Sequence, residues 1–165
     1  VPKPGLRRQR SAGVKAAAEM KRAGVSGAVI NSREIFFSPG PARGGGYQFD
    51  IGRGGRCTLL LQAVLPPLMM ASEESRIIVS GGTHVPLAPV YEFFEKTLKP
   101  QMEKLGPNIS CRLIRTGFMH AGGGSIEVEI EPKASKNIDL IEAGELVNLS
   151  CLSQSYGLQA SQAEI

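Results

Sequence analysis

The chain has 165 residues, of which 42% are hydrophobic, and a formal net charge of +4 at pH 7. These values suit one compact globular domain, or one domain and part of a second, and no apolar stretch is long enough to cross a bilayer. We therefore expect an ordinary globular protein with no membrane partner. The first residues, VPKPGLRRQR, contain neither an initiator methionine nor an apolar signal region. On this basis we expect the chain to be a portion of a longer protein.

Much of the positive charge lies near the start of the chain. A basic cluster with few acidic neighbours suits a polyanion such as a nucleic acid, although a solvated helix face would explain it as well. The three cysteines stand far apart and have no histidine at metal-ligand spacing. We expect reduced thiols in an intracellular protein, cytoplasmic or nuclear, and no metal site. The basic residues are Lys3, Arg7, Arg8, Arg10, Lys15, Lys21 and Arg22.

The first part of the chain predicts a helix followed by two short strands. Residues 4–23 carry a weak apolar stripe and end at Gly24, a residue type that is common at helix ends. Residues 25–30 and 34–38 predict the strands, and a loop rich in glycine and proline follows them. Arginines in the first helical turn oppose the helix dipole, which either a nearby external anion or a later start of the helix would explain.

The stretch YQFDIGRGGRCTLLLQAVLPP, residues 47–67, predicts a strand, a glycine-rich turn and the start of a helix. Glycines in such a turn let backbone amides approach a ligand closely, and the positive end of the following helix favours a phosphate or carboxylate. Arginine side chains add charge to the same rim. A plain tight turn between packed elements is the alternative interpretation. The predicted anion-binding turn consists of Arg53, Gly54, Gly55 and Arg56.

The helix predicted at residues 58–70 is apolar almost all round, so we expect it to be buried on several sides. Gln62 is its single large polar side chain. Such an amide is either a core glutamine bonded to the backbone or a residue that contacts a ligand, because an unpaired buried amide costs about 1–3 kcal/mol. Pro66 and Pro67 remove two amides and are expected to kink or end the helix.

The second half of the chain predicts one buried strand, one long helix and a pair of strands. These lie at residues 76–80, 90–105, 109–116 and 125–131. The loop GGTHVPLAP, which follows the first of these strands, is the second place where we expect a ligand. Ligands collect where loops leave the ends of strands in layered α/β structures.

The element order over residues 46–132 is βαβαββ, which predicts an α+β fold whose helices pack on one face of a mixed sheet. Residues 1–45 then correspond to the back half of a preceding repeat of this unit, and residues 133–165 to the start of a further repeat or an insert domain. Two more strands are predicted at residues 138–141 and 146–152, before a polar, loosely ordered end.

Four motifs, in this order and at this spacing, resemble the RNA 3′-terminal phosphate cyclases: PGLRRQ, GRGGRCTLLLQAVLPPL, VSGGTHVPLAP and RTGFMHAGGGSIEVEIEP. The likeness covers about residues 4–152. The large domain of that family is built from βαβαββ repeats, which it shares with the enolpyruvyl transferases, in agreement with the element order above. The resemblance therefore implies the same fold for this chain.

The resemblance implies an enzyme of the ligase class that uses ATP and Mg²⁺ to convert an RNA 3′-phosphate into a 2′,3′-cyclic phosphate. In the family a histidine is adenylylated first, AMP then passes to the RNA 3′-phosphate, and the neighbouring 2′-hydroxyl expels the AMP. Activation is needed because a phosphate monoester is a poor electrophile, and covalent catalysis divides one hard step into easier ones. Cationic residues and a divalent metal would offset the phosphate charge.

The resemblance also implies roles for particular residues. Gln62 corresponds to the adenine-contacting glutamine of the family, and Pro89 to the proline whose ring packs on the adenine face. Gln9, with its neighbours Arg8 and Arg10, matches a stretch near the RNA end and its terminal phosphate. ATP and RNA 3′ ends are thus the implied partners, and the resemblance favours a ligand-contacting role for Gln62.

The chain departs from the family pattern in several places. The N-terminal glycine-rich segment and the C-terminal nucleophilic histidine of the family have no counterpart here, and neither His84 nor His120 matches the nucleophile's context. We therefore expect that this chain alone does not cyclise RNA and that the remainder of the same protein would have to act with it. The last arginine of the turn would either crowd a nucleotide or bind its phosphates more strongly. Where the family usually has His, Ala-Gly-Ser and Tyr-Pro, this chain has Arg10, Gly54-Gly55-Arg56 and Met119-His120.

Two other functions agree with parts of this pattern. Cyclase-like ribosome-assembly proteins keep the fold without the catalysis, and the departures above favour them slightly, whereas the presence of Gln62 and Pro89 favours the enzyme. An enolpyruvyl transferase would need paired catalytic carboxylates and lysines that face a cleft. The acidic residues here look scattered over surface and strand positions, as in Asp50, Glu92, Glu95 and Glu127.

Overall fold

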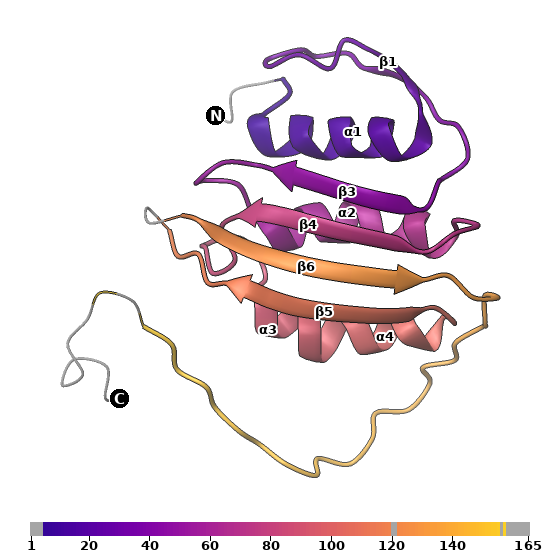
Figure 1. The fold of residues 1–165 in the computed structure, drawn as a ribbon. Coiled ribbons are helices and arrows are strands. Elements are labelled where there is room, and N and C mark those ends of the chain that lie inside the picture. The colour runs from indigo at the N-terminus through magenta and orange to yellow at the C-terminus, as the bar shows by residue number, and fades with distance from the viewer. Residues whose placement is uncertain (1–4, 120–121, 156, 158–165) are drawn as a thin grey trace.

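The structure, a computed structural model, describes residues 5–119, 122–155 and 157. Its main body is a four-stranded sheet with helices behind it, and a long extended segment runs away from the last strand (Figure 1). This arrangement confirms the predicted α+β fold. The predicted helix start at residue 4, His120 and most of the polar end of the chain lie outside the described residues.

The main sheet has the strand order β3-β4-β6-β5. β3 (Gly45–Asp50) is parallel to β4 (Ser75–Gly81), and β6 (Gly124–Glu131) is antiparallel to both β4 and β5 (Asn108–Arg115). The strict alternation of apolar residues in β6 points one face of this strand into the core. All four strands that the sequence predicts in this part of the chain are confirmed.

Helices cover one face of this sheet, as predicted (Figure 1). α2 (Cys57–Met69) packs against β4 and β6, and α1 (Arg8–Lys21) lies beside α2. Burial of these apolar side chains between helix and sheet is the main stabilising contribution to the fold. The fully buried side chains of this core include Leu60, Leu61, Leu65, Leu68, Ile77, Val79, Phe94, Ile126, Val128 and Ile130.

The long helix predicted at residues 90–105 is confirmed, with a wider turn in its middle. The Lys99 amide donates to the Phe94 carbonyl, five residues earlier, as in a π-helix. Pro100 has no amide to continue the α-helical ladder, which explains why the wider turn precedes it. None of the helices in the described part of the chain is long and apolar enough to span a bilayer. The three consecutive segments are α3 (Tyr91–Phe93), η1 (Phe94–Leu98) and α4 (Lys99–Lys104).

α2 differs from its prediction at two prolines. Pro66 and Pro67, which we expected to kink or end the helix, lie inside it. The carbonyl groups that lose their helical donors belong to Gln62 and Ala63, which are half-buried and exposed, so water can bond to them. The apolar helix is buried on several sides, by the sheet and by α1, but not all round, because Ala63, Pro66 and Met70 form an exposed apolar stripe.

The first two strands are shorter than predicted and form a sheet of their own. β1 (Gly24–Ser26) pairs antiparallel with β2 (Phe36–Ser38). β1 ends before Gly27, whose φ is +74° and where a β-carbon would lie 2.4 Å from the Glu34 carbonyl oxygen. The chain therefore turns into a loop where the sequence pattern predicts a continuing strand.

Residues 132–155 contain no strand, so the two strands predicted at 138–141 and 146–152 are wrong. Ile141 and Val147 are 86% and 94% exposed. A short strand needs a neighbouring edge to pair with, and this segment runs away from the sheet (Figure 1). Apolar, β-branched residues alone therefore did not make a strand here.

Replacing Leu61 by alanine should lower the free energy of unfolding by about 2–5 kcal/mol, because its side chain is fully buried in the core. Leu149→Ala is the matched control: Leu149 is 86% exposed in the extended segment, and we expect a change below about 0.5 kcal/mol. Urea unfolding followed by circular dichroism measures both values. Equal losses for the two variants would contradict this placement of the core.

Candidate functional site

Three loops meet at one end of the main sheet. They follow β3, β4 and β5, which run in the same direction, so the loops leave the sheet at the same edge (Figure 1). Backbone hydrogen bonds join them: the Gly82 amide donates to the Gly55 carbonyl over 2.7 Å, and the Thr83 amide to the Gly117 carbonyl over 2.9 Å. Because ligands bind preferentially beyond the carboxyl ends of parallel strands, this edge is the candidate functional site.

Gly55 and Gly82 allow the first two loops to touch. A β-carbon at Gly55 would lie 2.3 Å from the Ile51 carbonyl oxygen, and one at Gly82 would lie 2.9 Å from the Gly55 carbonyl oxygen. A side chain at Gly82 would push the turn after β3 away from the loop after β4, whereas a side chain at Gly55 would clash with Ile51 inside the turn itself. In the structure these glycines therefore bring two backbones together.

Backbone amides at the end of the predicted anion-binding turn and at the start of α2 are already bonded within the chain. The amides of Arg56 and Cys57, at the start of α2, donate to Gln9 Oε1 and to the Gly82 carbonyl. The positive end of α2 thus has fewer amides left for an anion. The charge that this turn offers to solvent comes instead from side chains, those of the exposed Arg53 and the half-buried Arg56.

Gln9 docks the start of α1 on this turn. Its Nε2 donates to the Arg56 carbonyl over 3.2 Å, and its Oε1 accepts from the Arg56 amide over 2.8 Å. The resemblance places Gln9 near the RNA terminal phosphate, whereas the structure shows its side chain holding Arg56 in place. The two roles are compatible, because an amide nitrogen carries two protons and Arg56 uses one of them.

Arg10 and Arg56 line the same groove. This basic groove has a volume of about 1120 Å³, lies between α1 and α2, and is also lined by Arg7 and Gln9. The structure therefore brings together residues of the first motif and of the turn, which are far apart in the sequence. Arg8 lines a separate hollow and does not join this group. The apolar floor of the basic groove consists of Val14, Ala17, Phe37, Leu59, Leu60 and Ala63.

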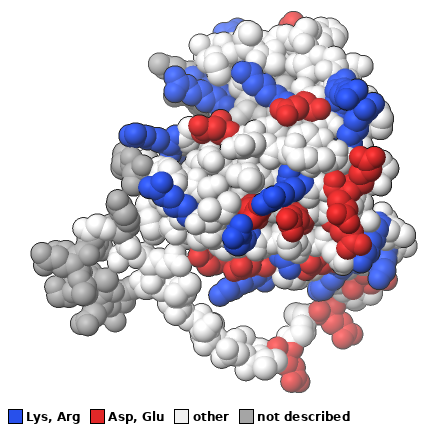
Figure 2. Space-filling view, viewed as in Figure 1, with Lys and Arg blue, Asp and Glu red and all other residues white. Residues whose placement is uncertain are grey.

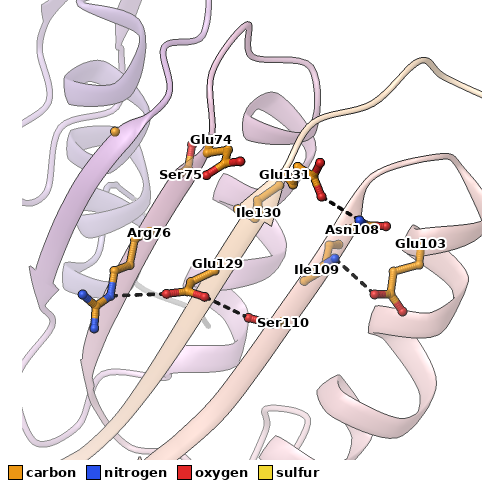
Figure 3. Close-up of a pocket in the computed structure, with 11 residues that line it drawn as sticks. Glu74, Ser75, Arg76, Glu103, Asn108, Ile109, Ser110, Glu129, Ile130 and Glu131 are labelled. Atoms are coloured by element: carbon orange, nitrogen blue, oxygen red, sulfur yellow. Dashed lines mark hydrogen bonds and ion pairs between the residues drawn. The ribbon is translucent and has the colours of Figure 1, made fainter.

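Acidic side chains gather at the opposite end of the sheet (Figure 2). Three of them are held by neighbours: Glu131 accepts from Asn108 Nδ2 over 2.6 Å, Glu103 from the Ile109 amide over 3.1 Å, and Glu129 from Ser110 Oγ over 3.3 Å (Figure 3). A polyanion would be repelled from this end and attracted to the basic groove. The hollow at the acidic end has a volume of about 620 Å³, and its carboxylates are Glu74, Glu103, Glu129 and Glu131.

Gln62 and Pro89 lie near one side of α2. Thr58 Oγ1 donates to the Pro89 carbonyl over 2.7 Å, and Thr58 shares a helix face with Gln62, four residues further on. Gln62 and Pro89 are both half-buried, and the Gln62 side chain has no hydrogen-bond partner among the described residues. An available amide and an apolar ring on the same side of α2 are groups that can contact the edge and the face of an adenine base.

The next question is whether the described residues offer a cluster of ligands for Mg²⁺. Within the described ranges no group of three or more His, Cys, Asp or Glu side chains could hold a metal ion. Carboxylates next to the three loops are engaged inside the chain: Asp50 Oδ1 accepts from the Gly52 amide over 2.8 Å, and Glu92 Oε2 lies 2.8 Å from His84 Nε2. Among the described residues, no preformed cluster of side chains is therefore available to hold Mg²⁺ by itself.

His84 is the centre of a hydrogen-bonded cluster that the sequence did not reveal. Its Nδ1 lies 2.8 Å from Thr83 Oγ1, its Nε2 lies 2.8 Å from Glu92 Oε2, and its ring stacks on Phe118. With both ring nitrogens engaged, His84 is not a free nucleophile. The spacing of eight residues between His84 and Glu92 crosses a loop, so no helix or strand period relates the two side chains and no sequence pattern could mark the pair.

The Glu92 carboxylate is bonded from two sides. Partial burial raises the pKa of Glu92, but hydrogen bonds from its own backbone amide, from Gln154 and from His84 lower it more, so the pKa lies below its usual value of 4.5. Gln154, in the extended segment, donates from Nε2 to Glu92 Oε1 over 3.1 Å. The cluster thus ties the loop after β4 to the start of α3 and to the end of the extended segment.

Comparison with known proteins identifies the family. Residues 1–161 match the family described as RNA 3′-terminal phosphate cyclase. The chain belongs to this family. A curated RNA 3′-terminal phosphate cyclase of Pseudomonas fluorescens is 43% identical over 162 residues, which are 98% of this chain and 47% of that protein. The chain thus spans about half the length of this cyclase, and the resemblance drawn from the four motifs is confirmed.

In this member of the cyclase family, Gln9→Ala should lower the free energy of unfolding by about 1–2 kcal/mol, because it removes two hydrogen bonds to the Arg56 backbone. Gln48→Ala is the matched control, since Gln48 is exposed on β3, and it should change stability by less than about 0.5 kcal/mol. Chemical denaturation measures both. If Gln9→Ala costs no more than the control, the amide does not hold the turn.

Glu92 should make stability depend on pH. Because its pKa is lowered in the folded chain, its contribution is present above its usual pKa of 4.5 and is lost as the pH falls through the lowered value. The stability difference between the wild type and Glu92→Gln should therefore shrink as the pH falls below 4.5. Denaturant unfolding over a pH series measures it, with Glu145→Gln, an exposed position in the extended segment, as the control. A difference that does not vary with pH would contradict this role.

Proposed function

We propose that the protein acts as an RNA 3′-terminal phosphate cyclase, an ATP-dependent enzyme of the ligase class that converts an RNA 3′-phosphate into a 2′,3′-cyclic phosphate. The family match and the name of the relative support this proposal. The structural observation that carries it is the basic groove, where Gln9, Arg10 and Arg56 lie together beside the loop end of the sheet. RNA 3′ ends and ATP are the substrates in this proposal.

The basic groove suits the terminal phosphate of an RNA. Arg10 is exposed at its rim and places a guanidinium, with its several donors for phosphate oxygens, where the family usually has a histidine. Arg56 adds a second guanidinium, and Gln9 keeps one amide proton for a phosphate oxygen. Arg8, which lies outside the groove, would act only through long-range attraction.

The other face of α2 suits the nucleotide. The Gln62 amide can both donate to and accept from the edge of an adenine, and the Pro89 ring offers an apolar surface to its face. Thr58 holds the Pro89 carbonyl, which limits the movement of this surface. Bound ATP would supply the good leaving group that an unactivated phosphate monoester lacks. Mg²⁺ enters the proposal as an ion carried by the ATP phosphates.

The proposal assigns binding, rather than the nucleophile, to the described residues. Both ring nitrogens of His84 are engaged, and His120 lies outside the described residues. The name of the relative favours a cyclase over a cyclase-like ribosome-assembly protein and over an enolpyruvyl transferase. We also propose an intracellular location, which suits an RNA substrate and the three free cysteines.

The division of the chain into repeats is part of the proposal. Residues 46–132 would form the complete βαβαββ unit, residues 1–45 the back half of a preceding one, and residues 133–165 the start of a further repeat or an insert domain. Two observations support the first boundary: β3 to β6 pair with one another in one sheet, and β1 and β2 pair in a separate one.

Gln62→Ala should weaken ATP binding about threefold to tenfold, because a neutral hydrogen bond contributes about 0.5–1.5 kcal/mol. Gln101→Ala is the matched control: it makes the same change in a helix, at an exposed side chain that accepts from Lys104. Isothermal titration calorimetry measures the affinity of the wild type and of both variants. Equal ATP affinity in the two variants, or no ATP binding by the wild type, would contradict the role proposed for Gln62.

A further inference from the structure

A second cationic pocket lies where the three loops meet. Its volume is about 340 Å³, and it shares Arg56 with the basic groove. Within the described ranges no acidic residue lines it. The turn after β3 contributes Arg53, Gly54 and Arg56. The loop after β4 contributes Val85, Pro86 and Leu87, and the loop after β5 contributes Met119. We call it the three-loop pocket.

Both arginines of this pocket are positioned by the chain. The Arg53 side chain makes no hydrogen bond or ion pair with another described residue, but its stem packs against Gly122, where a β-carbon would lie 2.8 Å from Arg53 Cβ and Cγ. Arg56 Nε donates to the Pro86 carbonyl over 3.2 Å. Two guanidinium groups with no carboxylate in the same pocket suit the oxygens of a phosphate.

The remaining wall of the pocket is apolar and exposed. Leu87 is 87% exposed, and its φ of +62° lies in the left-handed region that leucine rarely adopts. Met119, on the facing loop, is 52% exposed. Exposed apolar side chains on a strained backbone are unfavourable for the chain itself, and such strain is concentrated at ligand sites. A nucleotide suits this pocket, since its anionic phosphate can bind the two arginines and its base has apolar faces that can pack on the apolar wall.

The position of the pocket relates it to the RNA end. The proposed function places the terminal phosphate in the basic groove, beside Arg10. Arg56 lines both that groove and the three-loop pocket, so the two hollows adjoin at this side chain. The three-loop pocket therefore lies within reach of an RNA strand whose end is held in the groove, on the far side of Arg56.

We propose that the three-loop pocket binds the nucleotide that precedes the 3′-terminal nucleotide of the RNA. Its phosphodiester lies between Arg53 and Arg56, and its base packs on Pro86, Leu87 and Met119. This inference rests on the proposed function and adds the path of the RNA to it. Among the described lining residues, the two arginines alone have polar side chains, so the pocket accepts any base at this position.

Binding of a short single-stranded RNA with a 3′-phosphate, measured by fluorescence anisotropy over a salt series, tests the proposal. Arg53→Gln should weaken binding about tenfold and reduce the slope of log affinity against log salt by about 0.7, the value for one phosphate contact on a single strand. Arg43→Gln is the matched control, because it removes the same charge from an exposed residue that precedes β3, at the opposite end of that strand. It should change neither quantity.

Leu87→Gly separates binding from folding. Glycine adopts a φ of +62° without strain, so the variant should keep its thermal stability, yet it loses part of the apolar wall and should bind the RNA about threefold more weakly. RNAs that differ only in the base before the terminal nucleotide should bind the wild type with nearly equal affinity.

The outcomes distinguish this inference from the proposed function. If Arg53→Gln leaves the salt slope unchanged while Arg10→Gln reduces it, the RNA ends in the basic groove but does not cross the three-loop pocket, and the inference alone is overturned. If the wild type does not bind the phosphorylated RNA, the proposed function is contradicted and the inference with it. Strong preference for one base before the terminal nucleotide would also overturn the inference.

Discussion

The backbone pairing between Gly55 and Gly82 is the contact on which the loop end of the molecule depends. The Gly82 amide donates to the Gly55 carbonyl, and the Cys57 amide to the Gly82 carbonyl, over 2.7 and 2.9 Å. These bonds hold the start of α2 against the loop after β4. A larger residue at Gly82 would press on the Gly55 carbonyl and separate these segments, so that the three-loop pocket would lose the contact between two of its walls. A larger residue at Gly55 would clash with Ile51 and distort the turn after β3.

The loop after β4 is fixed at both ends and open in the middle. His84 ties its beginning to Glu92 at the start of α3, and Thr58 on α2 ties its end through the Pro89 carbonyl. Between these two tethers the chain exposes Leu87, which can then hold an unfavourable backbone conformation. A nucleotide base on either side of this loop would therefore meet a surface that is already ordered, which reduces the entropy lost on binding.

Local patterns in the sequence predicted the elements but not the contacts between distant segments. The long apolar run of α2, which is too long for one strand, and the alternation in β6, which follows the period of a strand, were sufficient to place both elements. The strands expected at residues 138–141 and 146–152 failed because their pattern does not show whether a partner edge is near. The hydrogen bonds between Gln9 and Arg56 join residues 47 positions apart, and a local sequence pattern cannot predict a contact between residues so far apart in the chain.

The hydrogen bonds between Gln9 and the Arg56 backbone also help to explain why an arginine can replace a small residue at the end of the turn. The Arg56 amide already donates to Gln9 Oε1, so an anion beside α2 has to be held by side chains rather than by this helix-end amide. The Arg56 side chain borders both the basic groove and the three-loop pocket, and its Nε bonds to the Pro86 carbonyl at their common edge. Of the two effects considered for this arginine, crowding and added charge, its position at the rim therefore favours added charge.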